Sequence, residues 1–327
     1  MRLLITGGTG FIGSRLALRA RELGHKVVAT GLARSTAEAA RQQVLSAAGI
    51  EVLEMDLATL ASTPAVWQGR EEVIHLAAAQ HEMNVPDAHF HAVNVKGTRL
   101  VLDAAKAAGA TFVYGSTIGV YGSRSGTIDE TTPVGPDNIY GRTKLEAEQM
   151  ALARAGEQRV AVVRITETYG PGDRRLLKLF KAIKAGHFMM VGQGRNLHQP
   201  IYVDDLADLL LLTATHEAAQ GQVILSAGKE AVTTEEMVSA IADAVGGVQP
   251  RLRVPLAPVT AVAIVLETTL RPLGIQPPLH RRRIDFFRKS FELSGGKALQ
   301  LLGFEPQVGF REGAERTARW YEQAGEL

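Results

Sequence analysis

The chain begins with a short apolar segment, a glycine-rich turn and an amphipathic segment, and this order constrains the fold more than any other feature. Residues 3–5 are apolar, residues 6–13 read TGGTGFIG, and residues 11–23 have the periodicity of a surface helix. A strand that enters a helix through such a turn brings backbone N–H groups and the positive end of the helix dipole to one point, where a pyrophosphate binds. A glycine-rich turn without a ligand is the alternative, and the strand and helix around the motif favour a dinucleotide. The predicted contacts are Gly7, Gly10, Phe11, Ile12 and Gly13.

Composition narrows the class of protein. The 327 residues are 46% hydrophobic, which suffices for a large core and predicts two lobes. Basic and acidic residues nearly cancel, 36 against 34, so neither nucleic acid nor a membrane surface is expected as the main partner. The absence of cysteine excludes disulfides, thiolate nucleophiles and cysteine-ligated zinc. No leader precedes the first strand and no apolar run is long enough to span a bilayer, so we expect a cytoplasmic protein.

Apolar runs alternate with helical patterns along the chain. Strands are expected at residues 26–30, 51–54, 73–78, 111–114 and 223–225, and helices at residues 35–48, 94–108 and 139–155. Continuous apolar runs suit strands that are buried on both faces. The alternation predicts an α/β fold with a parallel sheet.

The ends of the predicted strands indicate how the cofactor lies. The second strand ends without an acidic residue and with Arg34 nearby, which favours NADP(H) slightly over NAD(H), with Arg34 on the 2′-phosphate or else simply in solvent. Asp56, beside Leu57, follows the third strand and either meets the adenine amino group or caps a helix. The fourth strand ends in small and apolar residues that suit a cofactor across the sheet edge, namely Leu76, Ala77 and Ala78.

Several histidines lie near this edge. His75 is on an apolar strand, and we expect it to be a core residue rather than a catalyst. His89 and His91 have a spacing that can ligate a metal, but no clear set of carboxylates accompanies them. We therefore predict no metal site.

A tyrosine and a lysine stand four residues apart in the predicted helix 139–155. This spacing puts the Tyr140 phenol and the Lys144 ammonium on one helical face. A phenol titrates near pH 10, so a neighbouring cation is needed if tyrosine is to act as a base near neutrality. None of the other five tyrosines has a lysine four residues later. Ser116 and Thr117 follow the fifth strand and are expected at the same sheet edge.

These motifs, in this order, resemble the extended short-chain dehydrogenases/reductases, the NAD(P)-dependent epimerase/dehydratase family. Further matches are residues 94–98 (NVKGT), 120–122 (VYG), 169–172 (YGPG) and 203–207 (VDDLA), with Arg164. The resemblance implies Tyr140 as general acid/base, Lys144 on the nicotinamide ribose with Ser116 nearby, and Thr117 on the reacting oxygen. It also implies that the sheet is doubly wound, of the Rossmann type, with an NAD(P)-binding domain at 1–168, to which 200–227 return, a smaller substrate-binding lobe at 169–199 and 228–327, and a homodimer through the helices at Asn94 and Tyr140.

Departures from the family pattern narrow the reaction. Dehydratases of the group usually carry acidic residues directly after the threonine, whereas Ile118 follows here, so dehydration is not expected. Nucleotide-sugar members tend to have asparagine where Glu167 stands and an arginine near His198. Glu167 and His198 are therefore candidate substrate contacts, and a carboxylate there would repel a diphosphate.

The C-terminal half resembles the 3β-hydroxysteroid dehydrogenase-like branch more loosely, through residues 254–256, 277–279, 291–302 and 303–306. Residues 257–270 are expected to form an apolar helix, either as core or over a lipophilic substrate. The sequence thus favours an NAD(P)-dependent oxidoreductase that interconverts a secondary alcohol and a ketone. The alternative is a nucleotide-sugar epimerase with tightly bound NAD. A non-catalytic NADP(H) sensor is a third class, against which the Tyr140–Lys144 pair argues.

Overall fold

The computed structural model describes residues 1–59, 67–80, 85–250, 252–270 and 281–327. Its centre is a sheet of seven strands in the order β12-β7-β5-β4-β1-β2-β3, and every pairing is parallel. The predicted Rossmann-type sheet is confirmed. Its strands are β1 (Arg2–Thr6), β2 (Lys26–Gly31), β3 (Glu51–Glu54), β4 (Glu72–His75), β5 (Thr111–Thr117), β7 (Val160–Ile165) and β12 (Val223–Ser226).

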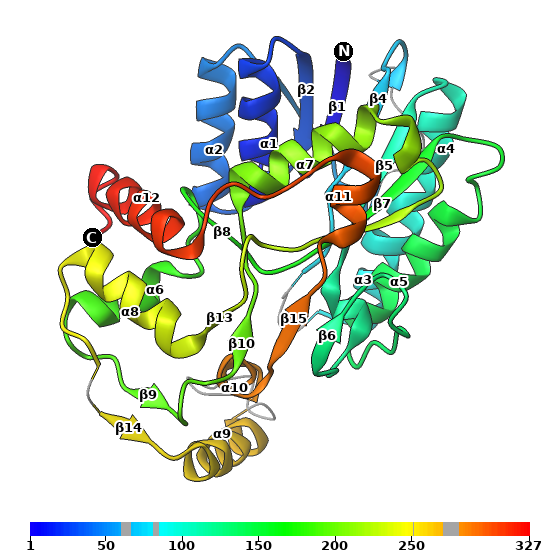
Figure 1. The fold of residues 1–327 in the computed structure, drawn as a ribbon. Helices are drawn as coiled ribbons and strands as arrows, with labels where there is room; N and C mark the ends of the chain where they lie inside the picture. The colour runs from blue at the N-terminus through cyan, green and yellow to red at the C-terminus, as the bar shows by residue number, and fades with distance from the viewer. Residues whose placement is uncertain (60–66, 81–84, 251, 271–280) are drawn as a thin grey trace.

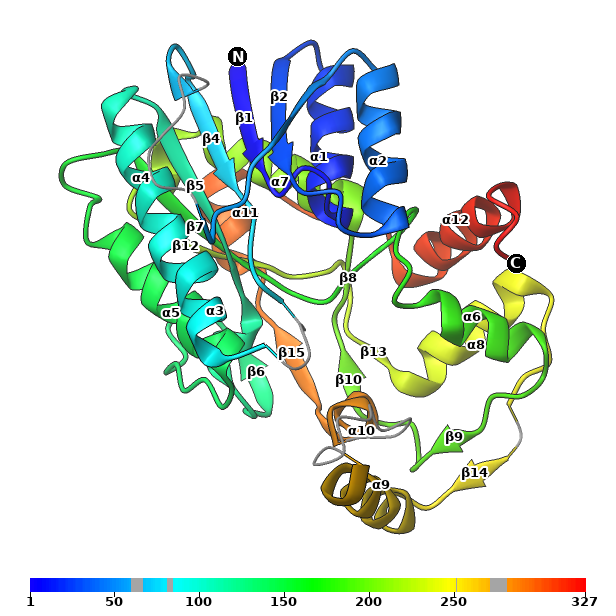
Figure 2. The same cartoon turned by 180° about the vertical axis from the view of Figure 1, so that it is seen from behind.

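Successive residues of the strands point to opposite faces of the sheet, and helices cover both (Figures 1 and 2). Leu3 and Ile5 pack on one side with α1 and α7, whereas Leu4 packs on the other side with α4 and α5. The apolar runs are therefore buried on both faces, as in other parallel sheets. The helices concerned are α1 (Phe11–Glu22), α2 (Thr36–Ala47), α4 (Thr98–Ala107), α5 (Ile139–Leu152) and α7 (Val203–Thr215).

A second group of elements lies beyond the carboxyl ends of the strands (Figure 1). Its core joins α6, α8 and α12 through side chains such as Phe180, Ile241 and Tyr321. The helices are α6 (Leu177–Lys184), α8 (Thr234–Val245), α9 (Leu256–Leu270), α10 (Arg281–Arg288) and α12 (Phe310–Gln323). Paired short strands link them: β6 (Gly126–Ile128) with β15 (Phe291–Leu293), β8 (Thr168–Tyr169) with β11 (Ile201–Tyr202), β9 (Met190–Val191) with β14 (Arg253–Val254), and β10 (Leu197–His198) with β13 (Val232–Thr233). Helix α11 (Gly296–Leu302) instead packs on the central sheet, on the same side as α1 and α7 (Figure 1).

Several boundaries differ from the sequence prediction. The helix expected from residue 94 begins earlier, as α3 (Asp87–Phe90) continues into the π-helical turn η2 (His91–Gly97) and then α4. The strand expected at 73–78 ends at His75, and the strand expected at 111–114 continues to Thr117. The short helices η3 (Ile118–Tyr121) and η4 (Glu217–Ala219) were not predicted. The apolar helix expected at 257–270 is present as α9, whereas residues 277–279 lie outside the described ranges.

The glycine turn is packed so closely that side chains have no room in it. Gly7 has a φ of 72°, and a Cβ added there would lie 2.7 Å from the backbone nitrogen of Ala77, just beyond β4. A Cβ on Gly13 would lie 2.2 Å from the carbonyl oxygen of Gly7. These glycines therefore allow β1, α1 and the end of β4 to approach one another. In the described ranges, no helix is long and apolar enough to cross a membrane.

We predict that Gly13→Ala destabilises the protein by roughly 1–3 kcal/mol, because the added methyl group overpacks the turn, and that it weakens dinucleotide binding. Urea unfolding and calorimetric titration with NADH would measure the two effects. Gly156→Ala is the matched control, since a Cβ there meets nothing within 4 Å. The packing argument is wrong if the two variants unfold and bind alike.

Candidate active site

A cavity of about 690 Å³ lies at the carboxyl edge of the central sheet. Residues from the glycine turn, the ends of β4 and β5, and α5 line it together. All the residues predicted for the cofactor or for catalysis are among them: Gly7, Gly10, Phe11, Ile12, Gly13, Arg34, Asp56, Leu57, Leu76, Ala77, Ala78, Ser116, Thr117, Tyr140 and Lys144. The structure brings these residues together, and their individual roles stay predictions.

The cavity wall at the glycine turn fits a dinucleotide. Gly10 is the N-cap of α1 and provides no side-chain cap, so no capping side chain covers the first backbone N–H groups of the helix. At the other end, Thr166 lines the cavity, and its hydroxyl is buried and has no hydrogen-bond partner among the residues that the structure describes. A bound ligand with polar groups would provide hydrogen-bond partners for the N–H groups of α1 and for the Thr166 hydroxyl. Sequence analysis did not single out Thr166, since one threonine after a strand carries no distinctive pattern.

Arg41 connects the glycine turn to the chain that leaves the sheet after β8. Its guanidinium donates to the carbonyl oxygens of Thr9, at 3.4 Å, and Gly172, at 3.1 Å. Burial lowers the pKa of Arg41, and neighbouring arginines lower it further. Arg41 thus joins two loops that border the cavity.

At the adenosine end, the structure pairs two residues that were predicted as separate contacts. An Nη atom of Arg34 lies 2.6 Å from a carboxylate oxygen of Asp56. Asp56 also accepts a hydrogen bond from the backbone N–H of Ala58 at 2.9 Å, and residues 57–59 form a turn, so the alternative role as a helix cap stays a prediction. The Arg34 side chain remains 54% exposed, so it is accessible to a ligand in the cavity.

The catalytic candidates meet where α5 begins beside the end of β5. Asn138 caps the helix by accepting a hydrogen bond from Gly141 at 2.9 Å. A Cβ on Gly141 would lie 2.7 Å from the carbonyl oxygen of Gly119, so this glycine lets η3 contact the helix. Thr117 accepts from the backbone of Gly119 at 3.0 Å. The start of α5, which carries Tyr140, is thereby held against the loop that carries Thr117.

Lys144 is buried, with 2% of its surface exposed. Its Nζ donates to the carbonyl oxygen of Gly115 at 2.6 Å and lies 4.1 Å from the centre of the Tyr114 ring. Burial lowers the pKa of Lys144 to about 7, against the opposing effect of the Glu148 carboxylate. A lysine in this setting changes charge near neutral pH.

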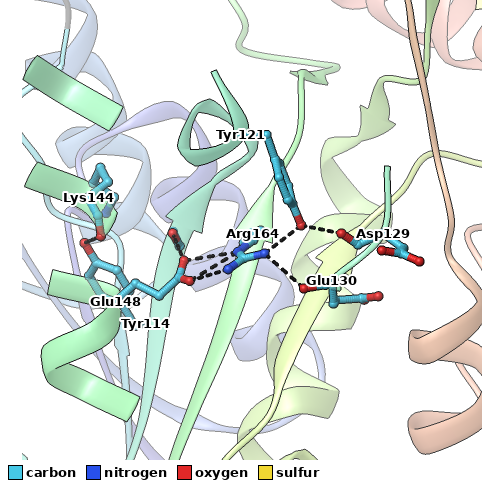
Figure 3. Close-up of polar contacts among 8 residues, drawn as sticks. Tyr114, Tyr121, Asp129, Glu130, Lys144, Glu148 and Arg164 are labelled. Carbon is cyan, nitrogen blue, oxygen red and sulfur yellow. Dashed lines mark hydrogen bonds and ion pairs between the residues drawn. The ribbon is translucent and has the colours of Figure 1, made fainter. Parts of the chain in front are cut away.

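A buried polar network continues behind Lys144 (Figure 3). Glu148 on α5 lies 2.6 Å from Arg164 on β7 and also accepts a hydrogen bond from the Ser116 hydroxyl at 2.6 Å. Arg164 donates to the Tyr121 hydroxyl at 2.7 Å. Sequence analysis gave no role to Glu148, although its position four residues after Lys144 placed it on the same helical face.

The two candidate substrate residues contact each other. The Nδ1 atom of His198 lies 3.0 Å from a Glu167 carboxylate oxygen, and the His198 ring stacks on Phe286 with centres 4.6 Å apart. His198 is buried, whereas the Glu167 side chain is 43% exposed. The cavity is lined by their neighbours Thr166 and Thr168 rather than by this pair. Substrate contact by Glu167 and His198 stays a prediction.

His75 is a core residue, as the sequence indicated. It is fully buried and hydrogen-bonds Thr6 at 2.6 Å and Thr98 at 2.9 Å. Burial, together with the Lys144 charge, lowers the pKa of His75 to about 3. His91 instead pairs with Glu146. Within the described part of the chain, no three His, Asp or Glu side chains gather as a metal site would require.

The parallel sheet and its glycine turn define a Rossmann-type α/β protein. The particular family follows from its sequence: residues 3–228 match the NAD dependent epimerase/dehydratase family, and the chain belongs to that family of NAD-dependent enzymes. The resemblance stated from the motifs is therefore confirmed.

Relatives in the family include a reductase and a dehydrogenase. The chain is 30% identical to the 2-alkyl-3-oxoalkanoate reductase of Stenotrophomonas maltophilia, over 97% of this chain and 98% of that protein. It is 28% identical to 3beta-hydroxysteroid-dehydrogenase/decarboxylase isoform 2 of Arabidopsis thaliana over 82% of this chain, and spans about half of that protein, 51%. A solved structure of UDP-glucuronic acid 4-epimerase from Bacillus cereus, in complex with NAD, has the same fold, with a TM-score of 0.80 and 22% identity over 99% of both chains.

We predict a pH dependence of stability that His75 causes. Its pKa is about 3 in the folded protein against an ordinary 6.5, so between these values the unfolded chain binds a proton that the folded chain excludes. The free energy of unfolding therefore falls as pH drops through this interval, by up to about 1.4 kcal/mol per pH unit. Urea unfolding between pH 4 and 6.5 should show a smaller slope for His75→Gln. The exposed His187, changed to Gln, should keep the wild-type slope, and equal slopes for all three proteins would contradict the assignment.

Proposed function

We propose that this protein is an NAD(P)-dependent oxidoreductase that interconverts a secondary alcohol and a ketone. The observation that carries the proposal is the position of Tyr140, Lys144 and Thr117, which line the same cavity as the glycine turn. A dinucleotide held at the turn and extended across the sheet edge would reach these three side chains. In the proposed organisation, residues 1–168 and 200–227 bind the dinucleotide, and the remaining residues form the substrate lobe. The predicted homodimer stays a prediction.

Each of the three side chains has a task in this chemistry. When bound, the nicotinamide exchanges a hydride with the carbinol carbon of the substrate. Tyr140 takes the hydroxyl proton during oxidation and returns it during reduction. Lys144 in its charged form stabilises the phenolate, and the Thr117 hydroxyl hydrogen-bonds the oxygen on which charge develops.

A largely apolar substrate is the better match. The two relatives reported above are named for a hydroxysteroid and for an alkyl-substituted oxoalkanoate, and neither name contains a nucleotide sugar. The Glu167 carboxylate, held by His198, would disfavour the diphosphate of a nucleotide sugar. Thr117 is followed by Ile118 rather than by acidic residues, which argues against dehydration.

Epimerisation of a nucleotide sugar is the second candidate, favoured by the fold shared with a UDP-glucuronic acid 4-epimerase. An epimerase regenerates its cofactor in each cycle and can keep it bound, whereas an oxidoreductase must exchange it. Denaturing the purified protein and measuring any released nucleotide separates the two. Near-full occupancy by NAD would favour the epimerase.

We predict that Tyr140→Phe lowers turnover at least about 100-fold, because the general acid/base is lost, while NADPH affinity changes little. The assay would follow nicotinamide absorbance with a panel of 3-ketosteroids and 2-alkyl-3-oxoacids. Tyr321→Phe is the matched control, since Tyr321 hydrogen-bonds Asp173 outside the cavity. Turnover that survives in Tyr140→Phe would contradict the assignment of Tyr140 as the general acid/base.

The preference for NADP(H) is a finer proposal and depends on Arg34. We predict that Arg34→Ala weakens NADPH about tenfold, as expected for loss of a charged contact worth about 1.4 kcal/mol, and that it weakens NADH much less. Arg21→Ala is the matched control, since Arg21 is exposed and does not line the cavity, and it should change neither affinity. Fluorescence titration measures all four affinities. An equal effect of Arg34→Ala on the two forms would remove this arginine from the phosphate site.

A further inference from the structure

The network behind the cavity ties three elements of the sheet edge together at adjacent points (Figure 3). Lys144 on α5 donates to the carbonyl oxygen of Gly115, and one turn later Glu148 accepts from the hydroxyl of Ser116. Two successive residues of β5 are therefore fixed by two residues on one face of α5. They are the two residues before Thr117, so this double attachment determines where the strand places its threonine.

Glu148 is also bound by a residue of the third element, the strand β7. Arg164 on β7 contacts its carboxylate with two nitrogens, Nη2 at 2.6 Å and Nε at 3.2 Å from Oε1. Both side chains are buried, with 2% and 7% of their surfaces exposed. Buried ion pairs of this kind are weak sources of stability, because desolvation offsets much of their attraction. Stability alone is therefore a poor reason for a carboxylate at this position.

The charges around Lys144 indicate what the carboxylate does. Tyr114 on β5 packs against the ammonium, but burial raises the pKa of its phenol and keeps it neutral. His75 on β4 is neutral as well, since burial lowers its pKa. On α5, Tyr140 precedes the lysine by one turn and Glu148 follows it by one turn. Burial opposes the charged lysine, and the Glu148 carboxylate is the anion that counters this effect.

We propose that Glu148 is a positioning residue that keeps Lys144 in its charged form and fixes Ser116, with Arg164 holding the carboxylate in place. The functional meaning rests on the proposed reaction, in which a charged Lys144 is required beside Tyr140. Glu148 does not line the cavity, and it acts only through the residues that do.

The experiment reads the charge of Lys144 directly and needs no substrate. The ¹³Cε chemical shift of lysine changes on protonation, and the Lys144 signal is assigned as the one absent from Lys144→Met. We expect a titration midpoint near pH 7 in the wild-type protein. In Glu148→Gln the midpoint should fall by about one pH unit, which means a tenfold smaller ratio of charged to neutral lysine.

Further variants keep the test decisive. Glu148→Gln leaves Arg164 without its anion and can unfold. Glu148→Gln/Arg164→Gln is therefore compared with Arg164→Gln, because these two variants differ only in the carboxylate, and the midpoint should be lower in the double variant. Glu130 contacts Arg164 through its backbone carbonyl, and its carboxylate accepts from the backbone N–H of Leu225, so Glu130→Gln should leave the midpoint unchanged (Figure 3). Equal midpoints in folded Arg164→Gln and the folded double variant overturn the proposal. Turnover in Tyr140→Phe would overturn the reaction instead, so the two failures are distinct.

Discussion

The contact between the glycine turn and the end of β4 is the constraint on which the site depends. Only a residue without a side chain permits the backbone of Gly7 to lie against Ala77 and that of Gly13 to lie against Gly7. Because of this contact, the chain can turn sharply from β1 into α1 at the edge of the sheet. The N–H groups at the start of α1 then lie at the cavity. The remaining walls are then set by the parallel order of β1, β4 and β5, which bring their carboxyl ends to one side.

At this edge, burial determines the charge of the ionisable side chains as much as ion pairing does. Lys144 is surrounded by a carbonyl oxygen, an aromatic ring and a single carboxylate one turn away. Its pKa is about 7, so it changes charge near neutral pH. His75, which is fully buried on the central strand β4, is kept neutral by the same low polarity. One apolar environment therefore produces an inert histidine and a responsive lysine, because burial acts on an ordinary pKa of 6.5 in the first and of 10.5 in the second.

How much of this the sequence reveals depends on how local each signal is. The glycine turn, the strand runs and the Tyr140–Lys144 spacing are local, and from them the sheet and the residues around the cavity could be predicted. The pairing of Glu148 with Arg164 could not, because its two residues lie on a helix and a strand whose relative rotation no periodicity gives. The Arg34–Asp56 pair was missed for a similar reason: each residue ends a different strand, and only the parallel register of β2 and β3 brings them together. The early start of the helix at α3 depends on the π-helical turn η2, whose wider hydrogen bonding has no simple sequence pattern.

Arg41 joins two loops that belong to different parts of the chain. One guanidinium holds both the loop at Thr9 and the loop at Gly172, which belong to the first turn of the sheet and to the segment that departs from it after β8. The two loops cannot separate unless this bridge breaks. The position of the segment after β8 and that of the glycine turn therefore depend on each other, and Arg175, whose guanidinium lies 5.5 Å from the centre of the Phe11 ring, links the same two parts of the chain.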